Sequence, residues 1–404
     1  MKKLELLAPA GDMERLRMAL HYGADAVYLA GTEFGMRASA GNFDESGLRE
    51  AVRLCHEKGA AVHVACNTLP REDELSRLPA YLGLLGDIGA DALIVADLGV
   101  LALAKKYAPG TALHVSTQLG VVNSEACKAL FDMGVSRAVL ARELSLDEIR
   151  RIRKNAPPAL ALEAFVHGAM CVSFSGRCLL SNYLAGRDAN RGDCAQPCRW
   201  KYHLVEEKRP GEYLEISEDG GSFILNSSDL CMIAHLPELI DAGVTSFKLE
   251  GRMKSAYYTA VVTNAYRHAL DAARADRPLE QVWIDEVGKI RHRKYTTGFY
   301  FGQPGQNTSA AGIYFSSADV CAVVESCDGE GNALLTQRNK FSECDAVELL
   351  TNDGEPLSFT AGALRDGENR PISAAPHPLM PVRMRLPRTC APLSLLRKSR
   401  TDAP

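Results

Sequence analysis

The stretch Gly23-Ala24-Asp25-Ala26-Val27-Tyr28-Leu29 places a glycine shortly before an apolar run. Glycine ends a helix readily because it adopts the left-handed conformation without a side-chain clash, and a short apolar run is typical of a strand buried on both faces. The same pattern returns at 59–64, 89–95, 134–140 and 243–249. Its repetition predicts alternating helices and strands, and therefore a parallel sheet.

Three further apolar runs complete the set of candidate strands before residue 250. They lie at 4–8, 113–117 and 162–166, and bring the number of strands to eight. Eight parallel strands with intervening helices close a (β/α)₈ barrel. An open doubly wound sheet is the alternative, but the first strand is followed by Pro9-Ala10-Gly11-Asp12 and not by a glycine-rich dinucleotide loop. We therefore predict a TIM-like barrel over residues 1–305.

The connection between the seventh and eighth strands is unusually long, at about 80 residues. We expect an insertion at 169–222, on the side of the barrel where loops after the strands build active sites. Two apolar runs at 213–216 and 223–225 flank Asp219-Gly220-Gly221, which predicts a hairpin. After the eighth strand a long helical stretch is expected from about 257 to 293.

The pattern changes in the C-terminal part of the chain. Short alternating strands are expected at 320–324, 333–336, 346–350 and 382–386, separated by turn residues such as Asp328-Gly329. Short antiparallel strands with such turns are typical of a small β-barrel. We predict one over residues 306–404.

The bulk composition is that of an ordinary globular protein, with 46% hydrophobic and 24% charged residues. The formal net charge of −4 provides no general attraction to nucleic acid, so contacts with RNA must come from local basic groups. The start of the chain lacks the apolar core of a signal peptide, and no stretch approaches the ~18 apolar residues of a membrane span. The sequence predicts a cytoplasmic protein without membrane association, in a compartment where disulfides are rare.

Four of the twelve cysteines are grouped within 28 positions: Cys171, Cys178, Cys194 and Cys198, with the spacing C-x₆-C-x₁₅-C-x₃-C. Four thiolates hold either a 4Fe–4S cluster or a structural zinc ion. The wide and irregular spacing favours the iron–sulfur cluster over zinc, because zinc ribbons use paired loops with two residues between cysteines. Zinc is the alternative metal.

Polar side chains gather where the predicted strands reach the barrel mouth, a position at which side chains usually face the ligand. The candidates for acid–base chemistry are Arg142, Glu163, His167 and Glu250. The candidates for binding an anionic small molecule or an RNA phosphate are Gln118, Arg142, Arg177, Arg191, Arg252 and Lys254. Structural ion pairs, such as Lys248 with Glu250, are the alternative for each charged residue.

The insertion also alternates basic residues such as Arg191 and Arg199 with the aromatic residues Tyr183 and Trp200. This composition suits single-stranded RNA, whose exposed bases stack on aromatic rings. A solvated loop with a few anchoring aromatic residues is the alternative.

Four motifs carry a resemblance to a known family. They are Leu7-Ala8-Pro9-Ala10-Gly11, Glu163-Ala164-Phe165-Val166-His167-Gly168-Ala169-Met170-Cys171 with its continuation Ser175-Gly176-Arg177-Cys178, Asn190-Arg191-Gly192-Asp193-Cys194-Ala195-Gln196-Pro197-Cys198-Arg199, and Phe247-Lys248-Leu249-Glu250-Gly251-Arg252-Met253-Lys254. The whole chain resembles the collagenase-like peptidase family U32.

The resemblance implies a function that differs from the family's label. Members similar to this chain are tRNA-hydroxylation proteins, which make 5-hydroxyuridine at the wobble position and depend on iron–sulfur assembly and on prephenate. The resemblance implies an oxidoreductase-type hydroxylase that acts on the tRNA anticodon stem-loop, with a 4Fe–4S cluster on Cys171, Cys178, Cys194 and Cys198 and with prephenate as co-substrate. Other relatives hydroxylate a ribosomal RNA cytidine or a quinone precursor, and the need for a paralogous partner chain stays open.

Peptidase chemistry has no independent support in the sequence. Neither the H-E-x-x-H motif of zinc proteases nor the G-x-S-x-G elbow of serine hydrolases occurs. A metal-dependent peptidase and a non-catalytic RNA- or partner-binding protein with a structural cluster are the alternatives to an RNA hydroxylase.

Overall fold

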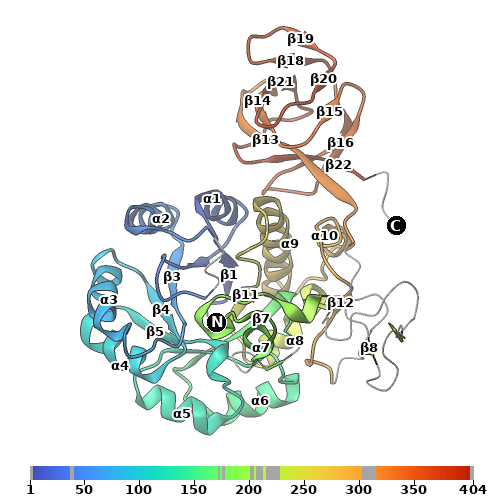
Figure 1. The fold of residues 1–404 in the computed structure, drawn as a ribbon. Coiled ribbons are helices and arrows are strands. Elements are labelled where there is room, and N and C mark those ends of the chain that lie inside the picture. Colours follow the sequence, from blue (N-terminus) through green and yellow to red (C-terminus); the bar gives the residue numbers. More distant parts are fainter. Residues whose placement is uncertain are drawn as a thin grey trace.

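Eight parallel strands form a closed barrel in the N-terminal part of the chain (Figure 1). The computed structural model describes residues 3–36, 41–171, 173–174, 178–200, 204–205, 213–214, 228–302 and 315–400. The barrel strands are β1 (Glu5–Pro9), β2 (Ala26–Leu29), β3 (Ala61–Cys66), β4 (Ala92–Val95), β5 (Ala112–Val115), β6 (Arg137–Val139), β7 (Ala161–Ala169) and β11 (Ser246–Leu249). Strand β11 pairs with both β7 and β1, so the sheet closes and the predicted barrel is confirmed.

Helices cover the outside of this barrel. They are α1 (Met13–His21), α2 (Glu45–Glu57), α3 (Leu78–Asp87), α4 (Leu98–Tyr107), α5 (Ser124–Asp132), α6 (Leu146–Asn155), α8 (Leu236–Asp241) and α9 (Ala256–Arg274). The glycines that follow five of these helices all have positive φ, between 71° at Gly59 and 93° at Gly23 and Gly243, as the repeating sequence pattern predicted.

The expected long helix after the eighth strand is interrupted. Helix α9 ends at Arg274, and a separate short helix, α10, spans Gln281–Glu286. Asp276 adopts the left-handed conformation with φ of 49°, and Pro278 lacks an amide hydrogen to continue the helix. These two residues turn the chain, so the prediction of one helical stretch from 257 to 293 is wrong.

The insertion after β7 contains the short helix α7 (Leu180–Ala185) and the 3₁₀ turns at Ala189–Arg191 and Pro197–Arg199. Strands β8 (Leu204–Val205) and β9 (Tyr213–Leu214) pair antiparallel with each other. The hairpin predicted around residues 219–221 lies outside the described residues. Strand β10 (Asp229–Cys231) then pairs antiparallel with β7, and β12 (Tyr295–Thr296) pairs parallel with β10, two pairings that the sequence did not predict.

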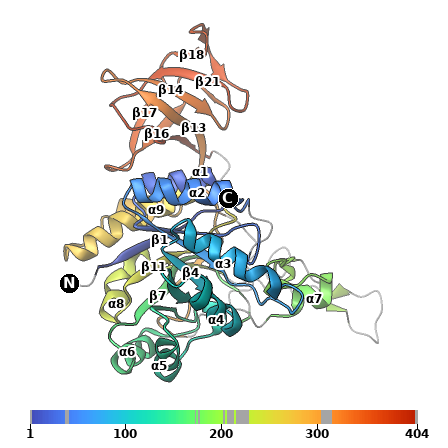
Figure 2. The ribbon, with the colours of Figure 1, turned by 90° about the vertical axis from the view of Figure 1, so that its left-hand side faces the viewer.

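The C-terminal part forms an antiparallel β domain with its own apolar core. Its strands are β13 (Ala318–Cys327), β14 (Asn332–Gln337), β15 (Phe341–Ser342), β16 (Ala346–Leu350), β17 (Leu357–Thr360), β18 (Leu364–Asp366), β19 (Pro371–Ile372), β20 (Ala374–Ala375), β21 (Pro381–Arg385) and β22 (Leu395–Ser399). Figure 2 shows this domain standing on the side of the barrel formed by α1 and α9, and α7 at the end of the barrel away from the amino terminus.

Buried contacts fasten the C-terminal domain to the barrel. The Arg397 guanidinium of β22 donates to both carboxylate oxygens of Glu286 in α10, at 2.6 and 2.7 Å. The hydroxyl of Tyr22, the residue that follows α1, donates to the carbonyl oxygen of Leu350 at 3.2 Å. Within the described part of the chain, no helix is both long and apolar enough to cross a lipid bilayer.

Candidate active site at the barrel mouth

A cavity of about 140 Å³ lies at the carboxyl ends of the barrel strands, and we call it the mouth cavity. Five of the residues predicted for the site line it: Gln118, Arg142, Cys171, Glu250 and Arg252. They come from the ends of β5, β6, β7 and β11, because parallel strands of a barrel end at the same face. In the structure these side chains therefore surround one space.

Arg142 connects the mouth cavity to the first of the grouped cysteines. Its side chain is buried, and it donates one hydrogen bond to the carbonyl oxygen of Ala169, at 2.9 Å, and one to the Cys171 Sγ, at 3.4 Å. The guanidinium also lies over the Phe165 ring, 5.2 Å from its centroid. A permanent positive charge therefore lies beside both the cavity and the first of the grouped cysteines.

The fold brings the four grouped cysteines together around α7. Burial raises the pKa of the Cys198 thiol, whereas the positive charge of Arg199 lowers it. Cys171, Cys194 and Cys178 each raise this pKa further, so the four sulfurs lie close enough to interact electrostatically. The backbone N–H of Ala195 donates to the Ser181 Oγ at 2.9 Å, which ties the Cys194–Cys198 loop to α7. The insertion is fastened in turn by Arg191, which donates to Glu74 at 2.8 Å.

The distances between the cysteine sulfurs can be compared with those that a bound zinc ion requires. Zn–S bonds of about 2.3 Å would bring four thiolates to roughly 3.8 Å from one another. Among the described residues, His63, His114 and Glu163 form the one group of three or more histidine, cysteine or acidic side chains whose ligand atoms all lie within 4.8 Å of one another. The grouped cysteines form no such group, so their sulfurs are spread more widely than 4.8 Å. No three of the described sulfurs therefore lie at the mutual distance that a zinc ion requires.

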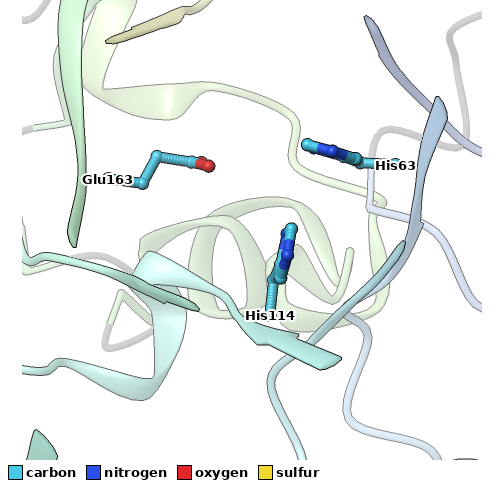
Figure 3. A group of neighbouring side chains, drawn as sticks. All are labelled: His63, His114 and Glu163. Atoms are coloured by element: carbon cyan, nitrogen blue, oxygen red, sulfur yellow. The ribbon is translucent and has the colours of Figure 1, made fainter. Parts of the chain in front are cut away.

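His63, His114 and Glu163 lie inside the barrel, below the mouth cavity. Figure 3 shows the three side chains, from β3, β5 and β7, pointing toward one another. Burial lowers the pKa of both imidazoles, that of His114 well below its usual range, and neither Nδ1 has a hydrogen-bond partner among the described residues. Two neutral histidines and one carboxylate form the ligand set of many iron enzymes.

Two cations nevertheless bind the carboxylate of Glu163. Lys248 donates to one oxygen of Glu163 at 2.9 Å, and Arg137 donates to the other at 3.1 Å. Arg137 also pairs with Glu5. A divalent ion here would be repelled by both cations, so we assign these residues to a buried ion-pair network and not to a metal centre.

Glu163 therefore has a different position from the one that the sequence suggested. Burial alone would raise its pKa, but Lys248 and Arg137 lower it to about 2, so the side chain stays ionised. It is not among the residues that line the mouth cavity, whereas its partner Lys248 and its neighbour on β7, Phe165, are. Lys248, for which the sequence offered an ion pair with Glu250 as the alternative, pairs with Glu163.

His167 also lies away from the mouth cavity. The pairing of β7 with β11 skips Val166, so Phe165 lies opposite Lys248 and His167 opposite Leu249. This β-bulge reverses the alternation of side chains and turns His167 outward, where its ring nitrogens lie 3.3 Å from the Tyr266 hydroxyl and 3.4 Å from the Tyr295 hydroxyl. Burial lowers the pKa of His167 to about 3. The geometry does not support direct contact between His167 and a ligand in the mouth.

The other predicted residues divide between the cavity and its surroundings. Arg252 donates to the backbone carbonyl of Met36 and to Asn42 at 3.3 Å, and the side-chain oxygen of Gln118 accepts from Asn67 at 2.8 Å. Lys254 lies in a separate groove beside α9. Arg177 lies outside the described residues.

Sequence reasoning placed Lys248 among the polar residues at the end of the eighth strand, but it missed the cavity residue Tyr28. The Lys248 ammonium lies over the Tyr28 ring, 4.5 Å from its centroid.

Comparison with known proteins agrees with the motifs. The sequence model of peptidase family U32 matches residues 11–310, and that of the peptidase family U32 C-terminal domain matches residues 316–397. The chain is 36% identical to tRNA hydroxylation protein P1 of Bacillus subtilis (strain 168), over 99% of this chain and 96% of that protein.

Two Escherichia coli (strain K12) proteins are also similar. tRNA hydroxylation protein P is 34% identical over 93% of this chain and 92% of its own length. The 23S rRNA 5-hydroxycytidine C2501 synthase is 39% identical over 91% of this chain and 56% of its own length. The family match covers most of the chain and these similarities extend over nearly all of it, so the chain belongs to peptidase family U32.

Proposed function

We propose that this protein is an RNA-modifying enzyme that hydroxylates C5 of the wobble uridine in tRNA. The observation that carries the proposal is the similarity, over more than nine-tenths of both chains, to two proteins named for tRNA hydroxylation. The rRNA synthase shares little more than half of its length with this chain, so we favour tRNA as the substrate. Among the described residues that line the mouth cavity there is no histidine to serve as the base of a protease.

We further propose that Cys171, Cys178, Cys194 and Cys198 hold a 4Fe–4S cluster. The proposal is supported by four thiols grouped beside the mouth cavity and spread more widely than zinc requires. When bound, such a cluster supplies electron transfer or a Lewis acid. The hydrogen bond from Arg142 to Cys171 orients this cysteine and links it to the cavity.

The charge of the mouth cavity suits an anionic co-substrate. Arg142, Lys248 and Arg252 contribute three positive side chains to its lining, against the single carboxylate of Glu250. Guanidinium groups bind carboxylates through paired, charge-assisted hydrogen bonds. We propose that these cations hold the carboxylates of prephenate, while the anticodon stem-loop approaches past the exposed rings of Tyr183 and Trp200 on the insertion.

The test is nucleoside mass spectrometry of total tRNA from a strain that lacks this gene. We expect 5-hydroxyuridine and its derivatives to be lost, and to return with the intact gene but not with Cys171→Ala. Cys344→Ala is the matched control, because Cys344 is also exposed but lies in the C-terminal domain. The absorption spectrum of anaerobically purified protein should show an iron–sulfur band in the control and none in Cys171→Ala.

Other outcomes would point to the alternatives. Unchanged tRNA in a strain without a redundant paralogue would contradict the proposal. If tRNA is unchanged but the same strain loses 5-hydroxycytidine from ribosomal RNA, or loses hydroxylated quinone, that molecule is the substrate of the same chemistry. Gelatin cleavage by zinc-loaded protein would favour the metal-dependent peptidase.

A further inference from the structure

A groove of about 620 Å³ lies between the barrel and the C-terminal domain, and we call it the domain groove. Its barrel wall is formed by α1 and by residues 253–258 at the start of α9. Its other wall is formed by the first residues of β13 and by Arg338, Asn339 and Arg400 of the C-terminal domain. We propose that the domain groove binds the single-stranded RNA that flanks the nucleotide held in the mouth cavity, an inference that rests on the proposed function.

The domain groove and the mouth cavity share one short stretch of chain. Glu250 and Arg252 line the mouth cavity, whereas Met253 and Lys254, the next two residues, line the domain groove. Consecutive Cα atoms are about 3.8 Å apart, so the two spaces lie within a few residues of each other along the rim. An RNA strand with one base in the mouth cavity would have its neighbouring nucleotides at the domain groove.

The charge of the domain groove is opposite in sign to that of the whole chain. The groove is lined by four cations, Lys254, Arg291, Arg338 and Arg400, and by two carboxylates, Glu14 and Asp319. Its formal charge is therefore positive, whereas the chain carries a formal charge of −4. A local basic surface on an acidic protein is the electrostatic pattern of a nucleic-acid site.

The ion pairs in the domain groove leave its arginines available to phosphate. Arg338 pairs with Glu14 at 2.6 Å and Arg400 pairs with Asp319 at 3.3 Å, and all four side chains are substantially exposed. Exposed ion pairs contribute little to stability, so a phosphate can take the place of the carboxylate. Arginine binds phosphate well because its planar guanidinium offers paired donors.

The floor of the domain groove suits bases as well as phosphates. Met253 has 45% of its surface exposed, and the partly buried residues Ala256, Tyr257 and Val320 add apolar surface beside it. Bases of single-stranded RNA pack on such surfaces, whereas the bases of a duplex stay stacked inside the helix. This combination favours a single strand over a double helix.

The two walls of the domain groove are held in place by buried contacts. Arg397, which is fully buried, binds Glu286 of the barrel, and Glu348 binds Arg397 at 2.9 Å and Lys289 at 3.0 Å. The groove therefore exists before RNA arrives, and binding does not have to order the two domains.

The experiment compares Arg338→Gln/Arg400→Gln with a matched control, Arg49→Gln/Arg370→Gln. The control residues are also exposed arginines paired with carboxylates, but neither lines the domain groove. Affinity for a fluorescent anticodon stem-loop RNA is measured by anisotropy over a range of salt concentrations. Thermal unfolding of each variant checks that the fold is kept.

We expect the groove variant to bind RNA more weakly and with a shallower salt dependence. Each phosphate contact on a single strand contributes about 0.7 to the slope of log K against log salt, so the slope should fall by about 1.4. At about 0.15 M salt this corresponds to roughly 14-fold weaker binding, with no change in the control.

The possible failures can be told apart. If wild-type protein modifies tRNA but the groove variant binds RNA like the control, the domain groove is not an RNA site. If the groove variant keeps its RNA affinity and instead loses a co-purifying protein chain, the groove belongs to a protein partner and the proposal is overturned. If wild-type protein neither binds nor modifies tRNA, the proposed function itself fails.

Discussion

Glu163→Gln provides a sharp test of the buried ion-pair network. The substitution keeps the size of the side chain but removes the negative charge that Lys248 and Arg137 share. Because Glu163 and Lys248 are almost fully buried, the cation loses its partner without gaining water. We therefore expect a large loss of folding stability.

Two routes lead to a similar magnitude. Removing one partner of a buried ion pair costs about 3–5 kcal/mol. The pKa of Glu163 is lowered from an ordinary value of 4.5 to about 2, because Lys248 and Arg137 outweigh the effect of burial. At about 1.4 kcal/mol per pKa unit, this lowering corresponds to about 3 kcal/mol of stability at neutral pH.

The pH dependence follows from the direction of the shift. A carboxyl group whose pKa is lower in the folded state stabilises the protein above the unfolded pKa, near 4.5, and this stability is lost as the pH falls toward 2. We expect wild-type protein to lose about 3 kcal/mol from this group across that interval. The Glu163→Gln variant should lack this part of the pH dependence.

The assay is urea unfolding followed by circular dichroism, at neutral pH and at several acidic values. Glu125→Gln is the matched control, because Glu125 pairs with Lys128 at 2.7 Å on the surface, where the cost should be at most about 1 kcal/mol. An unfolding free energy of Glu163→Gln equal to that of the control would refute the network. A stable Glu163→Gln variant that had lost RNA modification would instead restore Glu163 as a catalytic candidate.

Three further predictions concern the mouth, the outer face of β7 and the domain contact. Arg252→Gln should lower the affinity for prephenate by roughly 10- to 100-fold, since a charge-assisted hydrogen bond contributes about 1.5–3 kcal/mol; calorimetry that shows unchanged affinity would remove Arg252 from the anion site. His167→Phe should destabilise the protein by about 1–2 kcal/mol, because its contacts with Tyr266 and Tyr295 are lost, yet keep wild-type levels of tRNA modification in a complemented strain. A folded but inactive variant would show that His167 acts in the reaction. Glu286→Gln should destabilise the protein by about 3–5 kcal/mol in urea, because it deprives buried Arg397 of its main partner, and limited proteolysis should then release the C-terminal domain; resistance equal to that of wild type would contradict this.

The barrel was predictable from sequence because its signals are local. Each glycine lies next to the apolar run of its own strand, and strands such as 26–29, 92–95 and 246–249 begin and end as the pattern indicates. The helix predicted over 257–293 failed for an equally local reason, since Asp276 and Pro278 turn the chain. Four cysteines within 28 positions also had few ways to lie far apart.

By itself, the sequence therefore determined the family, the barrel and the candidate cysteine ligands, whereas the tertiary structure decided where each polar side chain points. The bulge at Val166 turns His167 outward, and this depends on the register between β7 and β11, strands about 80 residues apart. Glu163 is held by Arg137 and Lys248 from two other strands, and Lys254 lies in the domain groove because the C-terminal domain stands beside α9. Such pairings form through space between distant segments, so the order of residues along the chain does not reveal them.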